Sequence, residues 1–205
     1  MDEAFSFFVE QVGEPMYRQE VPASSIERYR NKLPAKLLQY WAEHGWCGYG
    51  DGVLWTVNPQ EYEGVVASVL ESSGLEKYDN FHLIARGAFG DLYLFGEKTG
   101  FSLKVTAQIG RYTGFKYQLS AADMDRHVQN FFVCMDLESN DFDDMFESAK
   151  KKLGTLGSDE MYGFVPALVF GGPVLFENLE KLKAVEHLVL LSQISPLEPY
   201  SFSDF

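Results

Sequence analysis

The chain has 205 residues, of which 46% are hydrophobic and 15% aromatic, and it carries a formal net charge of −13 at pH 7. This composition excludes an intrinsically disordered chain, and it argues against direct binding to DNA, RNA or anionic lipid. The excess of negative charge favours a basic partner instead.

The first segment, MDEAFSFFVEQVGEP, predicts an amphipathic helix that stops at residues 13–15, because apolar side chains recur there at helical spacing. It lacks the basic and long apolar stretches of a secretory signal. No segment of the chain approaches the roughly 20 apolar residues that a membrane helix needs. We therefore expect a cytoplasmic protein without membrane contact.

Residues 21–45 predict two further helices. Ser24 or Ser25 is expected to cap the first, Pro34 to open the second and Gly45 to end it. The glycines and aromatics of GWCGYGDG predict a turn region, and the alternating VLWTV that follows predicts a strand.

EYEGVVASVLESSG predicts a helix, and residues 81–108 predict two or three short strands with turns at Gly90 and at residues 98–100. The looser stretch RYTGFKYQLS marks a domain boundary or hinge. We expect one domain over 1–112 and a smaller α/β domain over 113–200, packed closely on the first.

In the C-terminal half, DMDRHVQNFFVCM predicts a helix and YGFVPALVFGG a buried strand. ENLEKLKAVEHLVLLSQI predicts a last helix, and the tail EPYSFSDF is expected to be loose. One face of that last helix is expected to hold Leu179, Leu182, Val185, Val189 and Leu190. The order of elements predicts an α+β fold, with helices packed on a mostly antiparallel sheet.

The stretch DLESNDFDDMFESAKKKLG places six carboxylates ahead of three lysines. Asp136, Glu138, Asn140 and Glu147 have the ligand spacing of an EF-hand calcium loop, but Asp141 stands where the loop's sharp turn needs glycine. No metal site is therefore expected here, and no cofactor elsewhere.

One helix explains the same charge order better. Phe142, Phe146, Ala149 and Leu153 share a helical face, with Asn140 or Asp141 as the cap. Asp143 and Asp144 then fall in the first turn and the three lysines in the last, as the helix dipole favours, and Gly154 ends the helix. Asp136 and Glu138 precede this helix, so an acidic patch at its start remains a second interpretation.

No arrangement typical of catalysis stands out. Cys47 and His44 are close in sequence, but His44 falls at a helix end, and Cys47 and Cys134 form neither a metal spacing nor a disulfide framework. GYGDG lacks the Lys-Ser/Thr of a P-loop, and no nucleophile or zinc-protease motif is found. We expect no catalytic residues.

Two long stretches carry a family resemblance. LPAKLLQYWAEHGWCGYGDGVLWTVNPQEY and HLIARGAFGDLYLFGEKTG strongly resemble the GAD-like domain, with its G-[FY]-G-D-G turn and its A-F-G-D-L-Y-L motif. KKLGTLGSDEMYGFVPALVFGGPVLFENLEKLKAVEHLVLLSQI resembles the C-terminal domain that often follows it. Together they cover almost the whole chain, in the order of the family.

The resemblance implies an immunity protein that binds a cognate type VI secretion toxin, a DNase, one-to-one and without chemistry. It gives no catalytic residues and does not fix the residues that contact the toxin. The acidic character agrees with it, because a nuclease presents a basic face to its substrate.

We therefore expect partner contacts at two places. The first is the acidic stretch, and the second is the turn after residue 45, where exposed aromatics could anchor a partner around an aspartate. The acidic candidates are Asp136, Glu138, Asp141, Asp143, Asp144 and Glu147, and the turn candidates are Trp46, Tyr49 and Asp51. The alternatives are an enzyme or ligand-binding module that uses the turn as a pocket, and a structural regulator that binds no toxin.

Overall fold

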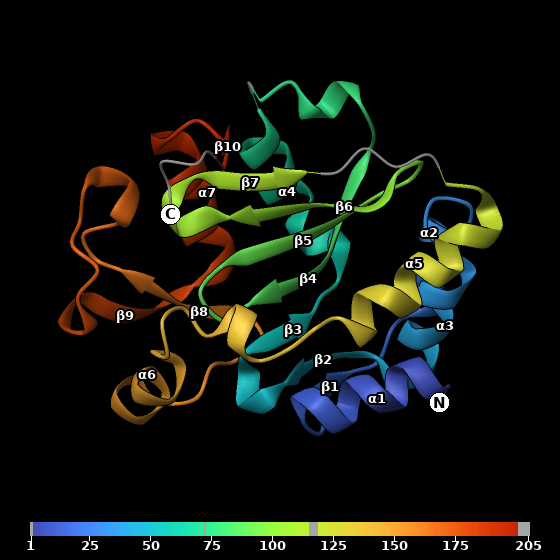
Figure 1. Ribbon diagram of the computed structural model, residues 1–205, viewed down its shortest axis with the longest axis horizontal. Coiled ribbons are helices and arrows are strands. Elements are labelled where there is room, and N and C mark those ends of the chain that lie inside the picture. The colour runs from blue at the N-terminus through green and yellow to red at the C-terminus, as the bar shows by residue number, and fades with distance from the viewer. Residues whose placement is uncertain (1, 72, 115–118, 201–205) are drawn as a thin grey trace.

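A computed structural model describes residues 2–71, 73–114 and 119–200. Within these ranges one sheet has the strand order β1-β2-β3-β4-β5-β6-β7-β10, and β8 and β9 form a separate two-stranded sheet (Figure 1). From β1 to β7 each strand pairs antiparallel with the next, and β10 pairs parallel with β7. The predicted α+β fold is confirmed.

The large sheet gains its core from its middle strands. Residues 83–87 and 92–96 are all buried, because helices cover both faces, so apolar residues follow one another there without alternating. The strand bounds are β1 Met16–Gln19, β2 Trp46–Tyr49, β3 Leu54–Thr56, β4 Phe81–Gly87, β5 Asp91–Gly96, β6 Gly100–Thr106, β7 Arg111–Gly114 and β10 Glu198–Pro199.

The N-terminal helices are α1 (Glu3–Val12), α2 (Ala23–Tyr29) and α3 (Ala35–His44). The predicted first helix and the roles of Pro34 and Gly45 are confirmed, since Pro34 directly precedes α3 and Gly45 ends it at φ 79°. The predicted serine cap is wrong. Helix α2 begins at Ala23 after Pro22, no side chain caps it, and the Ser25 hydroxyl donates to Gln60 Oε1 instead.

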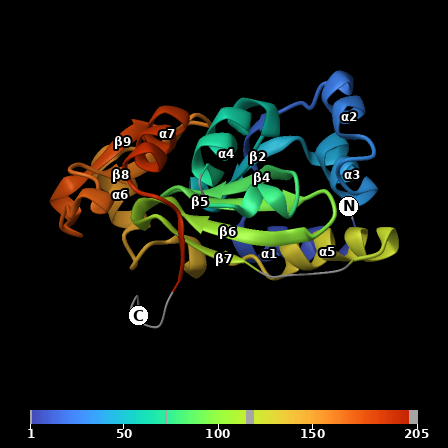
Figure 2. The ribbon, with the colours of Figure 1, turned by 90° about the horizontal axis from the view of Figure 1, so that it is seen from above.

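Helices lie on both faces of the sheet, as the view in Figure 2 shows. On one face α1 packs against α5 (Ala121–Val133), where the rings of Phe8 and Phe132 are 5.1 Å apart. On the other face α4 (Glu63–Leu70) packs against α7 (Ala184–Ile194), and the hydroxyls of Ser68 and Ser192 lie 2.6 Å apart. Because α5 and α7 follow residue 114 in the chain, the C-terminal half covers the sheet from both sides.

Two predicted elements of the C-terminal half are shorter than expected. Strand β8 (Glu160–Phe164) ends before residues 165–175, which form an exposed loop, and the predicted last helix begins at residue 184 instead of 177. Leu179 and Leu182 belong to β9 (Leu179–Lys183), which pairs with β8. The side chains that α7 buries are Ala184, His187, Leu188 and Leu191. Val185 and Val189 of the predicted face pack beside them, whereas Leu190 is 48% exposed.

The boundary that we proposed after residue 112 falls inside β7, a strand that β6 and β10 enclose. Residues 115–118 of the predicted hinge and 201–205 of the predicted loose tail lie outside the described residues. Hydrogen bonds join the two halves elsewhere. Tyr162 N donates to Ala88 O (2.9 Å), and Gln108 Nε2 donates to Phe89 O (3.0 Å) and Tyr162 O (3.3 Å).

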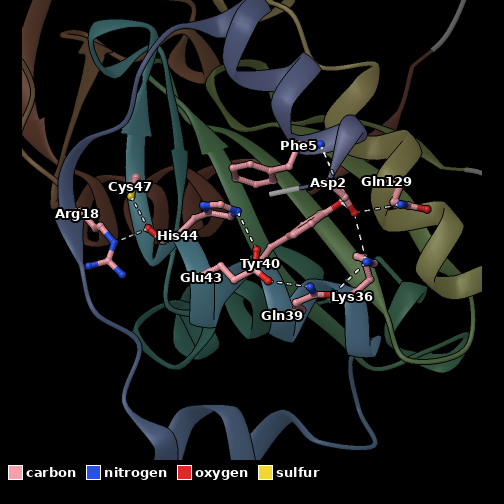
Figure 3. Close-up of polar contacts among 10 residues, drawn as sticks. All are labelled: Asp2, Phe5, Arg18, Lys36, Gln39, Tyr40, Glu43, His44, Cys47 and Gln129. Carbon is pink, nitrogen blue, oxygen red and sulfur yellow. Dashed lines mark hydrogen bonds and ion pairs between the residues drawn. The ribbon is translucent and has the colours of Figure 1, made fainter.

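Asp2 ties three helices together, as Figure 3 shows. Its carboxylate caps α1 by accepting from Phe5 N (3.1 Å), and it accepts from the Tyr40 hydroxyl of α3 (2.8 Å) and from Gln129 Nε2 of α5 (3.2 Å). Lys36 Nζ lies 3.2 Å away. Burial alone would raise the pKa of Asp2, but these four partners together outweigh it and lower the pKa to about 2.

We expect Asp2→Ala to lower the free energy of unfolding by about 1–3 kcal/mol, because it removes a helix cap and a shared acceptor. A carboxyl whose pKa is lowered on folding stabilises the protein above its unfolded pKa, and that contribution disappears as pH falls through the folded value. Asp2→Asn keeps an acceptor but no charge, so it should flatten the dependence of stability on pH between about 4 and 2. Urea denaturation across this pH range measures both effects, and parallel curves for wild type and the Asp2→Asn variant would contradict them.

Candidate functional site

The acidic stretch does not form the single helix that its charge order predicts. Helix α6 spans Phe146–Leu153, and Phe142, Asp143 and Asp144 have left-handed φ values of 48°, 55° and 58°. Asp143 and Asp144 therefore precede the first helical turn and are exposed. The end of the helix is as predicted, because the three lysines lie in its last turn and Gly154 has φ 86°. The predicted cap is wrong: Met145 occupies the N-cap position without a side-chain bond, and Asp141 Oδ1 accepts from Phe146 N (2.5 Å) from outside the helix.

Asn140 fixes this stretch to the sheet. Its side chain is buried, and its Oδ1 accepts from the Tyr93 hydroxyl of β5 (2.8 Å) while its Nδ2 donates to Asp136 O (3.0 Å). The Asn140 side chain thus points inward, away from the exposed carboxylates of Asp136 and Glu138. Among the described residues, no group of three or more His, Cys, Asp and Glu side chains is arranged to hold a metal ion.

The fold brings the two predicted acidic places together. Lys150 Nζ on α6 lies 2.7 Å from Glu147 Oε1 and 3.0 Å from Asp51 Oδ2, although Asp51 is 99 positions away in the sequence. The carboxylates of Asp51 and Glu147 remain 75% and 72% exposed. One surface therefore holds both candidates.

A groove of about 380 Å³ runs between these elements, and its lining includes Glu14, Asp51, Asp141 and Glu147. Leu137 also lines it, so the neighbouring Asp136 and Glu138 flank the groove. We call the eight carboxylates the acidic surface, namely Glu14, Asp51, Asp136, Glu138, Asp141, Asp143, Asp144 and Glu147. Such a concentration of one sign of charge attracts a basic ligand from beyond contact distance.

The expectation that Trp46 and Tyr49 are exposed is wrong. Both lie on β2 between β1 and β3, with 3% and 1% of their surface exposed. Trp46 packs edge-on against Trp41 with ring centroids 5.7 Å apart, and Tyr49 packs against Phe8 at 4.8 Å. Neither can contact a partner, so only Asp51 remains from this segment.

The glycines of this segment serve packing. A Cβ on Gly48 would come within 2.9 Å of the Trp55 ring, and one on Gly50, at φ 57°, within 2.5 Å of Leu137. The turn is therefore built so that Trp55 and Leu137 can approach the backbone. The alternative interpretation places a ligand pocket at Trp46–Asp51, where residues 46–49 are closely packed and buried while Gly50 and Asp51 line the groove.

The suspected Cys–His pair is not arranged for nucleophilic catalysis. Cys47 Sγ donates to the backbone oxygen of His44 (3.2 Å), and the His44 ring stacks on Phe5 with centroids 4.0 Å apart (Figure 3). Burial raises the pKa of the Cys47 thiol and lowers that of His44. A thiol held neutral and turned to a carbonyl is a poor nucleophile.

Neighbouring carboxylates destabilise the ionised form of Asp141, a member of the acidic surface. Burial raises the pKa of Asp141, and Asp144 and Glu147 raise it further, against the hydrogen bond from Phe146 N. A carboxyl with a raised pKa binds its proton more tightly when folded, so its ionised form opposes folding at neutral pH and this opposition disappears as pH falls. A positively charged side chain of a partner placed beside Asp141 would stabilise its ionised form.

Two substitutions separate the effect of the hydrogen bond that Asp141 accepts from Phe146 N from the effect of its charge. Asp141→Ala should lower the free energy of unfolding by about 1 kcal/mol, because Phe146 N loses its acceptor. Asp141→Asn keeps an oxygen acceptor and removes the repulsion, so it should leave stability unchanged or slightly higher. Denaturation at pH 7 checks this, and equal losses in the two variants would contradict it.

Sequence reasoning missed Glu14, Leu137 and Lys150 as members of this site. Glu14 follows α1, and Leu137 and Lys150 come from segments that the sheet brings beside it. Only the row of lysines after the acidic residues hinted at Lys150, and nothing local hinted at the other two.

Within the described chain, no helix is both long and apolar enough to span a bilayer.

Comparison with known proteins gives two family matches in sequence. Residues 3–109 match the GAD-like domain, and residues 125–195 match the family described as T6SS immunity protein Tdi1, C-terminal. Among curated proteins no significant match is found.

A solved structure has the same fold. The crystal structure of Atu4351 from Agrobacterium tumefaciens superposes with a TM-score of 0.84 at 22% sequence identity, over 97% of this chain and 93% of that one. The shared architecture thus includes both the large sheet and the C-terminal elements.

Proposed function

Because this chain belongs to the GAD-like domain family and carries the C-terminal domain of type VI secretion immunity proteins, we propose that it neutralises a cognate DNase toxin by binding over its DNA-binding face. Binding is one-to-one and involves no chemistry on the toxin. The observation that carries the finer part of this proposal is the acidic surface around the groove between α1, residues 50–53 and α6.

The physical argument rests on what a nuclease must present. An enzyme that holds a polyanion has a basic active face, and a protein of net charge −13 is attracted to that face by the same field. The carboxylates of Asp51, Asp143 and Asp144 are exposed and therefore available to basic side chains of a partner. Once bound there, the protein excludes DNA by occupancy and by repulsion.

Titration of DNA cleavage tests this function. A purified nuclease encoded beside this gene is mixed with increasing amounts of the protein, and cleavage of a linear duplex is followed. We expect cleavage to fall in proportion to added protein and to stop at equal molar amounts. Protection at far smaller amounts would instead indicate an enzyme that modifies the toxin, and no protection at any ratio would refute the proposal.

A further inference from the structure

The loop between β8 and β9 exposes a cluster of large apolar side chains. Val165, Phe170, Val174 and Leu175 are 44%, 66%, 48% and 50% exposed within eleven residues. We call residues 165–175 the apolar loop, which forms the orange projection at the left of Figure 1. Elsewhere in the described chain no stretch of eleven residues holds more than two such side chains. A local concentration of this kind is typical of a surface that another molecule covers.

The apolar loop is held in shape from within. Ala167 is buried, and Leu168 and Val169 pack on the core, so the inner side of the loop is fixed while the outer side faces solvent. Ala167 O also accepts from Phe170 N (3.0 Å) and Gly172 N (3.2 Å). A preformed apolar surface loses little conformational entropy when a partner covers it.

The base of the apolar loop lies next to segments that carry the acidic surface. The ring of Phe142, which precedes Asp143 and Asp144, lies 5.3 Å from that of Phe164, the residue before the loop begins. On the other side of the loop, Lys152 Nζ of α6 donates to the carbonyl oxygens of Phe176 (3.2 Å) and Glu177 (3.3 Å). The two ends of the apolar loop are therefore anchored beside Phe142 and beside α6, the segments that carry much of the acidic surface.

We propose that the apolar loop is the anchor that holds the toxin, and that its binding site on the toxin is an apolar depression ringed by lysine and arginine. The identity of this partner rests on the function proposed above. The acidic surface sets the rate of encounter, whereas burial of Phe170 and its neighbours sets the rate of dissociation.

Charge favours a basic toxin over a second copy of the chain or an anionic membrane as the partner of the apolar loop. Two copies of the chain would each bring a net charge of −13 to the contact, and an anionic membrane would repel the same net charge. A basic protein surface satisfies the apolar and the acidic parts at once. The loop is therefore assigned to the toxin.

Phe170→Ala tests the assignment, with Phe7→Ala as its matched control. Phe7 is 42% exposed on α1 and lines neither the groove nor the apolar loop, so both changes remove one exposed phenyl ring. The probe is a catalytically silent form of the purified neighbouring nuclease, immobilised for kinetic measurement. We expect Phe170→Ala to raise the dissociation rate roughly 30-fold, with an unchanged association rate and salt dependence, and Phe7→Ala to match wild type.

The outcomes separate this inference from the function on which it rests. If wild type binds and protects DNA but Phe170→Ala dissociates no faster than Phe7→Ala, the anchor is refuted and the immunity function stands. If wild type neither binds nor protects, both are refuted. If sedimentation shows a wild-type dimer that Phe170→Ala dissociates, while toxin kinetics are unchanged, the loop is an interface between copies and the anchor is again refuted. Equal thermal unfolding of the two variants, expected because both rings are exposed, excludes misfolding.

Discussion

Replacing Arg86 with alanine is expected to lower the free energy of unfolding by about 3–5 kcal/mol. Arg86 lies on β4 with none of its surface exposed. Its Nε donates to the Tyr62 hydroxyl (3.0 Å), its Nη2 donates to Ser158 O in the C-terminal half (2.8 Å), and its Cζ lies 5.4 Å from the centre of the Trp55 ring. Truncation opens a cavity and leaves buried polar atoms without partners.

Two milder variants divide this loss into its parts. Arg86→Met keeps most of the side-chain volume but leaves Ser158 O and the Tyr62 hydroxyl without a donor, and should cost about 1–3 kcal/mol. Tyr62→Phe removes one acceptor and should cost about 1–2 kcal/mol. Urea denaturation at pH 7 gives all three values. A loss below about 1 kcal/mol for Arg86→Ala would show that this arginine does not hold the two halves together.

Neutralising the acidic surface is expected to slow association with the toxin by roughly 10–100-fold at low ionic strength. The structure guides the choice of changes, because Asp143 and Asp144 have left-handed φ values that asparagine accepts more readily than lysine does. An asparagine in place of Asp136 also keeps the acceptor that this side chain offers to Ser139 N. The variant combines Asp136→Asn, Glu138→Gln, Asp143→Asn and Asp144→Asn.

A matched control removes the same charge elsewhere. It changes four exposed glutamates, one on α2, one just before α2 and two after α4. Both variants therefore lose four negative charges from the wild-type net charge of −13. The control combines Glu20→Gln, Glu27→Gln, Glu71→Gln and Glu76→Gln. Stopped-flow measurement over a salt series should show a reduced rate and a flatter salt dependence for the first variant alone. Equal rates for the two variants would mean that total charge, and not this surface, guides the encounter.

Local patterns predicted those elements whose signals lie within one segment. Helix α1 is set by Phe5, Phe8 and Val12 at helical spacing and by Gly13 after them, and the turn between β4 and β5 is set by Gly90 at φ 88°. The predicted order of helices and strands was therefore enough for the fold class. The position of Asn140 could not be predicted from a local pattern, because its hydrogen bond to Tyr93 connects residues 47 positions apart.

Where predictions failed, a contact distant in sequence decided the structure. Phe142 is four residues before Phe146, as on one face of a helix, yet it packs against Phe89 (5.5 Å) and Phe164 (5.3 Å) from a left-handed turn. Residues 179–183 have helical spacing of apolar side chains, but pairing with β8 holds them as a strand. The periodicity alone could not distinguish these cases.

The candidate site was predictable in its chemistry but not in its shape. Charge density pointed to the stretch from Asp136 to Glu147, whereas the exposed role given to Trp46 and Tyr49 failed because β2 lies inside the sheet. The link from Lys150 to Asp51 depends on how α6 packs beside the β2–β3 turn. Composition predicts the sign of the surface charge, whereas the residues that form one surface follow only from the fold.

The central claim is that this protein and DNA compete for the same face of the toxin. The direct measurement uses a short fluorescent duplex bound to the catalytically silent nuclease, to which the protein is added while the anisotropy of the duplex is recorded. The account predicts full release of the duplex at one equivalent of protein, and release that requires much more of the neutralised variant. A stable ternary complex, in which the duplex stays bound while the protein is also bound, would contradict it.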